Sequence, residues 1–274
     1  MKKSAWTIRL AWISGLLGGG LRLTQLLYAF EPKTQLPHPW HPASVGLFAL
    51  SLFFAATAVF LSSEIRVLWP ESHSFHTPIK ASMLFSAVLL AAMAALDIVA
   101  LMNEFKLSKF MYILLTFFAC GSIAALGLRL ERLGHSTIDG FLFTVVVFWC
   151  CFTLVLDFWG HAANPVLSAY VYHMFSLISL ALALYNAAGF FFGRGNVKWV
   201  LVFCSLGVYF ALVTGISLLA YPFLNRSETT LQMAETEPLV LIRLVFTTVF
   251  LSALSVAVSR GVVKREGAEK IPPD

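Results

Sequence analysis

Long apolar runs dominate this chain and decide what it can fold into. Of its 274 residues, 59% are hydrophobic and only 12% are charged. A helix rises 1.5 Å per residue, so about 20 apolar residues cross the roughly 30 Å hydrocarbon core of a bilayer. The predicted fold is therefore all-α: a polytopic bundle of eight transmembrane helices joined by short loops. The eight spans are predicted near residues 6–29, 44–62, 81–102, 110–128, 140–158, 166–191, 198–221 and 239–259.

The spans leave little chain for anything outside the bilayer. We therefore expect residues 1–274 to form a single integral membrane domain, with residues 260–274 as a cytoplasmic tail. Proline in the first turn predicts helix starts at Pro42, Pro165 and Pro238. Two of these prolines, Pro42 and Pro165, precede the second and sixth spans on the same side, a weak hint of a four-plus-four repeat.

Lysine and arginine are distributed unequally between the two sides of the predicted bundle. With a cytoplasmic N-terminus, thirteen of them fall in inner segments and four in outer loops, namely Lys33, Lys106, Lys109 and Arg226. Positive charge accumulates on the cytoplasmic side of membrane proteins. Both termini are therefore predicted to be cytoplasmic. Short loops of this kind favour the plasma membrane of a bacterium as the location.

The first apolar run begins like a signal peptide, with Lys2 and Lys3 before it. It continues past Arg22 without a convincing small-residue cleavage site, so we expect it to be retained as a helix. Gly15 and Gly19 form a small-xxx-small pattern that allows another helix to approach closely.

Several common classes of protein find no support in the sequence. The four cysteines lie in apolar runs without metal-ligand spacing, so neither a zinc site nor a disulfide framework is expected. Metalloprotease, Walker A, nucleophile-elbow and dinucleotide-binding motifs are missing. The net charge of +5 forms no basic stripe that would indicate nucleic-acid binding. No cofactor or metal is predicted, and an enzyme is less expected than a binding or transport protein.

Ionisable residues in or beside the spans are the strongest functional signal. A charged side chain at the centre of a bilayer costs about 2.5–3.5 kcal/mol on insertion scales. The predicted topology places six such residues in the outer half of the bundle, on five different helices. With Gln25, which shares a helix face with Arg22, they are the candidate ligand-binding residues: Arg22, Gln25, Asp97, Asp157, His161, His173 and Arg243.

Charge balance within this layer suggests specific pairs. Two arginines face two aspartates if the histidines are neutral, and buried charges need partners. Arg22 lies deepest, so we expect it to pair with Asp97 or Asp157. Arg243 lies near a helix start and can extend to the outer surface, so its link to the layer is weaker.

Three interpretations of this layer remain open. The leading one is an outer-half pocket that binds or transports a small polar or charged molecule, with arginines contacting anionic groups and aspartates contacting cationic groups. The second is a redox or proton-handling subunit or enzyme that uses His161, His173 and the aspartates. The third is a structural scaffold for another membrane protein, in which the charged residues only fix helix register.

Overall fold

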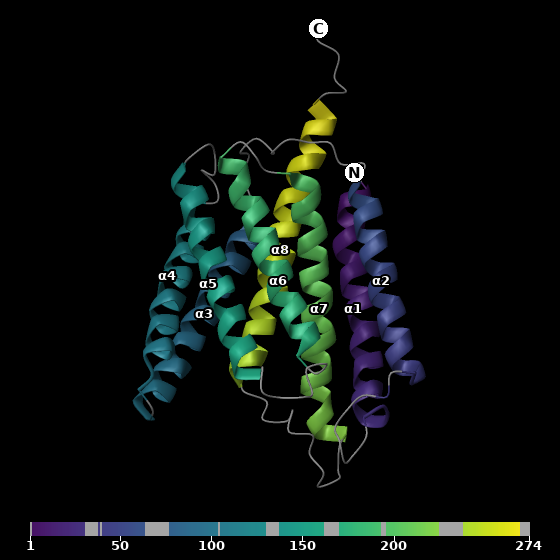
Figure 1. Ribbon diagram of the computed structural model, residues 1–274. Helices are drawn as coiled ribbons and strands as arrows, with labels where there is room; N and C mark the ends of the chain where they lie inside the picture. The colour runs from purple at the N-terminus through teal and green to yellow at the C-terminus, as the bar shows by residue number, and fades with distance from the viewer. Residues whose placement is uncertain are drawn as a thin grey trace.

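The computed structural model describes residues 2–30, 38, 40–63, 77–103, 105–129, 137–161, 170–192, 196–224 and 238–268. These residues form eight α-helices (Figure 1), which confirms the all-α prediction. The helices are α1 (Lys2–Tyr28), α2 (Pro42–Ser63), α3 (Thr77–Asn103), α4 (Leu107–Arg129), α5 (Thr137–His161), α6 (Val171–Phe191), α7 (Val197–Leu224) and α8 (Pro238–Ala268).

Seven of the eight helices in the described residues, α2 to α8, are long and apolar enough to cross a membrane. Helix α1 is not among them, although it is 27 residues long and packs alongside α2 and α7. It carries Arg9 and Arg22 within its length. The chain is thus a multi-pass membrane-type helical protein, and the eighth span remains a prediction.

The helix bounds agree with the sequence signals at two prolines and differ from them at the C-terminus. Helices α2 and α8 begin at Pro42 and Pro238. The expected tail over residues 260–274 is helical at first, because α8 continues to Ala268. Five of the nine residues 260–268 are good helix formers, and the next proline is Pro272. The expected start of the sixth helix at Asn164-Pro165 lies outside the described residues.

Six helices pack in a ring, in the order α3, α4, α5, α6, α7 and α8, with α8 returning to α3. The α1–α2 hairpin packs against α7, on the side opposite α3 and α4 (Figure 1). Helix α5 ends where α6 and α8 begin, and we call this end of the bundle the cluster end. Helix α1 begins and α8 ends at the opposite end.

Glycines of α1 explain its close packing on α7. A Cβ atom on Gly15 would lie 2.8 Å from Leu212, and one on Gly19 would lie 2.8 Å from Ile216. Gly20, on another face, has nothing within 4 Å of such an atom. The small-residue pattern predicted from the sequence is therefore confirmed as a helix–helix contact.

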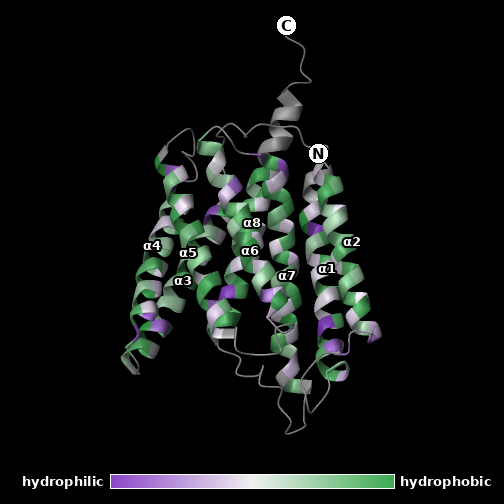
Figure 2. Ribbon diagram, in the orientation of Figure 1, coloured by the Kyte–Doolittle hydropathy of each residue, from purple (hydrophilic) through white to green (hydrophobic). Residues whose placement is uncertain are grey.

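Apolar side chains cover most of the outer surface of the bundle and hydrophilic ones are concentrated towards the helix ends (Figure 2). Large apolar side chains such as Phe53 and Phe60 on α2 are exposed. Surfaces of this kind are stable against lipid rather than water. Inside the ring, Trp149, Phe246 and Phe250 are fully buried and fill its middle.

Candidate functional site

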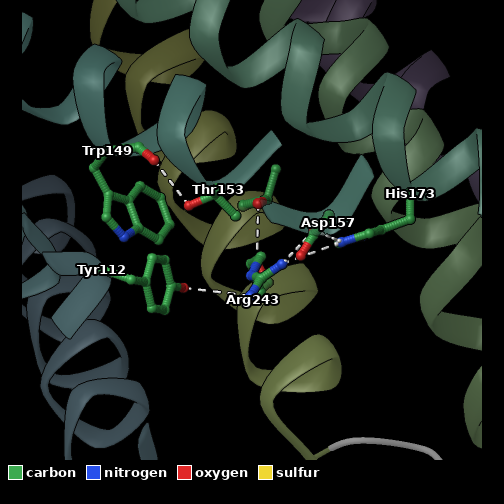
Figure 3. Close-up of polar contacts among 7 residues, drawn as sticks. Tyr112, Trp149, Thr153, Asp157, His173 and Arg243 are labelled. Atoms are coloured by element: carbon green, nitrogen blue, oxygen red, sulfur yellow. Dashed lines mark hydrogen bonds and ion pairs between the residues drawn. The ribbon is translucent and has the colours of Figure 1, made fainter. Parts of the chain in front are cut away.

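Four helices contribute to one polar centre inside the ring, near the cluster end. We call this centre the Arg243 cluster, and define it as Tyr112 of α4, Asp157 of α5, His173 of α6 and Arg243 of α8 (Figure 3). Helices α5 and α8 are not among the closely packed pairs. The long arginine side chain therefore spans the interior of the ring to reach Asp157.

An ion pair between Arg243 and Asp157 forms the centre of the cluster. Arg243 Nη1 donates to Asp157 Oδ2 at 2.5 Å. The Arg243 residue is only 7% exposed, whereas the side chain of Asp157 is 18% exposed. A buried charge is tolerated only when an opposite charge and hydrogen bonds compensate for it. The carboxylate thus stabilises the guanidinium in the interior while remaining within reach of the cluster end.

His173 contacts the same carboxylate oxygen. Its Nε2 lies 3.1 Å from Asp157 Oδ2 and 3.5 Å from Arg243 Nη1. An ionised aspartate only accepts hydrogen bonds, and arginine only donates them. A proton on Nε2 is donated to Asp157, and the longer contact with Arg243 Nη1 then joins two donors. The Nε2 donor is present in both the neutral imidazole and the imidazolium, and Arg243 and Asp157 carry opposite charges in either case.

Tyr112 completes the cluster from the side of α4. Its hydroxyl oxygen accepts a hydrogen bond from Arg243 Nη2 at 3.3 Å. The Nε atom of Arg243 is also buried, and it has no hydrogen-bond partner among the described residues. One donor of this buried guanidinium therefore stays available.

Aromatic side chains close the cluster on the side facing the middle of the bundle. The rings of Trp149 and Phe246 meet edge to face at 5.6 Å, and Phe246 stacks on Phe250 at the same separation. Trp149 Nε1 donates to Thr116 Oγ1 at 3.0 Å, so the indole is held in place across α4 and α5. These rings form an apolar floor beneath the polar groups.

Arg22 belongs to a second cluster, between α1, α2 and α6. Its Nη1 donates to the Gln25 side-chain oxygen, which confirms the predicted shared face, and Gln25 Nε2 donates to Ser44 Oγ at 2.9 Å. Its guanidinium carbon lies 5.2 Å from the centroid of Tyr172 and 5.8 Å from that of Phe30. Consecutive helix residues point about 100° apart, so Tyr172 faces this cluster while His173 faces the other.

The predicted layer is thus divided into two clusters. Asp157, His173 and Arg243 meet, and Asp97 of α3 lies within electrostatic range of Tyr112, whose hydroxyl binds Arg243. Arg22 was expected to pair with Asp97 or Asp157. Asp157 instead pairs with Arg243 across the ring, and Asp97 lies on α3, which packs on α4 and α8, whereas Arg22 contacts Gln25 and Tyr172. The link of Arg243 to the layer was expected to be weaker, because this residue can extend to the outer surface; it is instead buried and bonded to Asp157 and Tyr112. His161 ends α5, and its side chain lies outside the described residues.

Two further polar residues were missed from the sequence. In the sequence, Tyr112 is one of many aromatic residues and lies near a predicted helix end. Its spacing of four from Thr116 nevertheless places both residues on one face of the helix. Asp139, at the opposite end of α5, is buried and lies 3.5 Å from the Arg129 guanidinium. In the part of the chain that the structure describes, no group of three or more metal-ligating side chains is arranged to hold an ion.

Similarity to known proteins does not extend these observations. No protein-family model, no curated protein and no solved structure matches this chain.

Proposed function

We propose that this multi-pass membrane protein binds a small polar or charged molecule at the Arg243 cluster. One observation carries the proposal: a buried arginine is held by a carboxylate across the ring and retains an unused Nε donor. The aspartate partner is partly exposed at the cluster end, which provides a direction of approach. The aromatic floor provides an apolar surface beneath the ligand.

Ligand binding accounts for this cluster better than a purely structural role. Replacing a buried ion pair by apolar residues is often neutral or stabilising by about 1–4 kcal/mol, so such a pair is weak support for a stabilising function. Fixing helix register also needs only the two charged residues. Here four helices supply polar groups to one point, and an arginine donor is left over.

Our proposal for the membrane orientation is that α1 is the eighth span and that both termini are cytoplasmic. The Arg243 cluster would then open to the outside of a bacterial plasma membrane. The excess of lysine and arginine in the segments on the side of the termini supports this orientation. A green fluorescent protein fused to the C-terminus should fluoresce in cells, whereas an alkaline phosphatase fused there should be inactive. The reverse result would overturn the orientation.

A specific contact favours proton handling as a second candidate function. His173 lies 3.1 Å from Asp157, a distance at which the two side chains can exchange a proton. A transport cycle would additionally require the Trp149–Phe246 floor to move. Binding at one end is therefore the function that the geometry supports most directly.

Thermal unfolding of the detergent-purified protein tests the proposal. The panel should contain the standard amino acids, simple carboxylates, simple amines, inorganic phosphate and sugars. A ligand at about 100 times its Kd stabilises the native state by about 2.7 kcal/mol. We expect at least one compound to raise Tm and the Arg243→Gln variant to lose this rise. Arg129→Gln, at the opposite end, is the matched control and should keep it. A panel without any stabilising compound would overturn the proposal.

A further inference from the structure

We infer that the ligand is a small zwitterion whose carboxylate is bound by Arg243 and whose ammonium group is bound by Asp157. This inference rests on the proposed function and names the class of molecule that the same site takes. Three observations carry it: the opposite charges of the cluster, the available donor on Arg243 and the short distance between the two charges.

The opposite charges of Arg243 and Asp157 argue against a ligand with a single charge. The two side chains lie in contact, so a ligand that reaches one of them also lies beside the other. A monoanion would bring a further negative charge beside Asp157, and a monocation would bring a positive charge beside Arg243. Uncompensated charge is strongly disfavoured at a buried site. A zwitterion supplies a partner for both residues and leaves the net charge of the site unchanged.

The chemistry of the two side chains matches the two ends of a zwitterion. Guanidinium groups bind carboxylates through two parallel N–H donors, and the Nε donor of Arg243 is buried and unused. A carboxylate such as Asp157 accepts hydrogen bonds from an ammonium group. Because Asp157 is partly exposed, its oxygens can be approached from the cluster end without opening the aromatic floor.

The spacing of the charges indicates a short ligand. Arg243 and Asp157 lie in direct contact, with Nη1 2.5 Å from Oδ2, so a ligand that reaches both residues holds its two charged groups close together. In an α-amino acid a single carbon atom joins the carboxylate to the amino group. A longer ω-amino acid holds its charges further apart and fits this arrangement less well.

Isothermal titration calorimetry with matched probes tests this inference. The twenty standard L-amino acids are screened first. The tightest binder is then compared with its deamino analogue, which keeps only the carboxylate, and its decarboxy analogue, which keeps only the amine. For the wild type we expect each analogue to bind at least tenfold more weakly than the amino acid.

Two variants should invert this preference. Asp157→Asn leaves the arginine charge in excess, so the deamino analogue should bind more tightly than the amino acid. Arg243→Gln leaves the aspartate charge in excess, so the decarboxy analogue should be preferred. Arg129→Gln, at the opposite end of the bundle, leaves the cluster intact and should keep the wild-type order. If either charge variant fails to fold, the wild-type series still decides the question.

The outcomes separate the inference from the proposed function. If a singly charged analogue binds the wild type as tightly as the amino acid, the inference is overturned and binding at the site stands. The same holds if only phosphate, a sugar or a simple carboxylate stabilises the protein. If no compound of the panel binds, the proposed function fails, and this inference fails with it.

Discussion

Helix α5 carries two aspartates on its buried face, one near each end. Each of them pairs with an arginine, but the two pairs differ in their surroundings. Residues 139 and 157 are 18 positions apart, about five helical turns, so they lie on one face of the helix. Asp157 is 2.5 Å from a nearly buried arginine, Arg243. Asp139 is 3.5 Å from Arg129, whose side chain is 41% exposed.

The two pairs differ in which partner is removed from solvent. In the Arg243–Asp157 pair the arginine is buried and the aspartate is the partly exposed residue. In the Arg129–Asp139 pair the aspartate is 1% exposed and the arginine side chain is 41% exposed. The same two residue types therefore form an interior polar centre at one end of α5 and a contact with a partly exposed arginine at the other. The environment of the arginine, rather than the presence of an ion pair, distinguishes the two ends.

Replacing each arginine should give the largest difference in stability between the two pairs. Arg243→Gln leaves Asp157 and a polar cavity in the ring interior, and loss of one partner of a buried pair costs about 3–5 kcal/mol. Arg129→Gln should cost about 1 kcal/mol, because the Arg129 side chain is 41% exposed and solvent screens its contribution to the pair. The free energy of unfolding in mixed micelles measures both losses. Equal losses would show that the two pairs are equivalent.

Double-mutant cycles measure the coupling energy within each pair separately. The cycle of Arg243→Gln with Asp157→Asn should give a coupling energy of about 2–3 kcal/mol, near the upper end for residues in contact. The cycle of Arg129→Gln with Asp139→Asn should give about 0.5 kcal/mol. A larger coupling at the Arg129 end would contradict this account.

The contribution of His173 is expected to be smaller and to depend on Asp157. His173→Phe removes the donor to the carboxylate, and a hydrogen bond to a charged group is worth about 1.5–3 kcal/mol. In the Asp157→Asn background the same substitution should cost clearly less. The unfolding free energies of the four proteins measure this dependence. An unchanged cost would mean that His173 acts through packing alone.

Added salt should have the smallest effect, and it should lower only the coupling energy of the Arg129–Asp139 pair. The Debye length falls from about 10 Å at 0.1 M to about 3 Å at 1 M salt, and exposed charges are screened far more than buried ones. The coupling energy of the Arg129–Asp139 pair should therefore vanish in 1 M NaCl, while that of the Arg243–Asp157 pair should change little. A strongly salt-sensitive Arg243 pair would show that it is in contact with water.

The helices and the depth of the charged residues were readable from the sequence because both follow from position along the chain. Apolar run length sets each span, and proline marked the starts of α2 and α8. The number of residues from a helix end gives the depth of Arg22 and Arg243. Depth alone, however, does not reveal which direction around the helix axis a side chain faces.

The pairing of the charges could not be predicted because it depends on the order in which the helices pack. Arg22 was expected to meet Asp97 or Asp157, but α1 packs on α7 and α2, while α3 lies between α4 and α8 and α5 lies between α4 and α6. Asp139 was overlooked because it begins a helix next to a polar loop, a position that is usually solvated. Its 18-residue spacing from Asp157 was the available signal for a shared buried face.

The Nε–H of Arg243 gives the most direct test of the central claim that this arginine binds a ligand. Its resonance can be followed by NMR of ¹⁵N-arginine-labelled protein in nanodiscs and assigned by its loss in Arg243→Lys. When the compound that most stabilises the protein is added to saturation, we expect this resonance to shift while that of Arg129 stays in place. An Arg243 resonance that does not move at saturation would contradict the account.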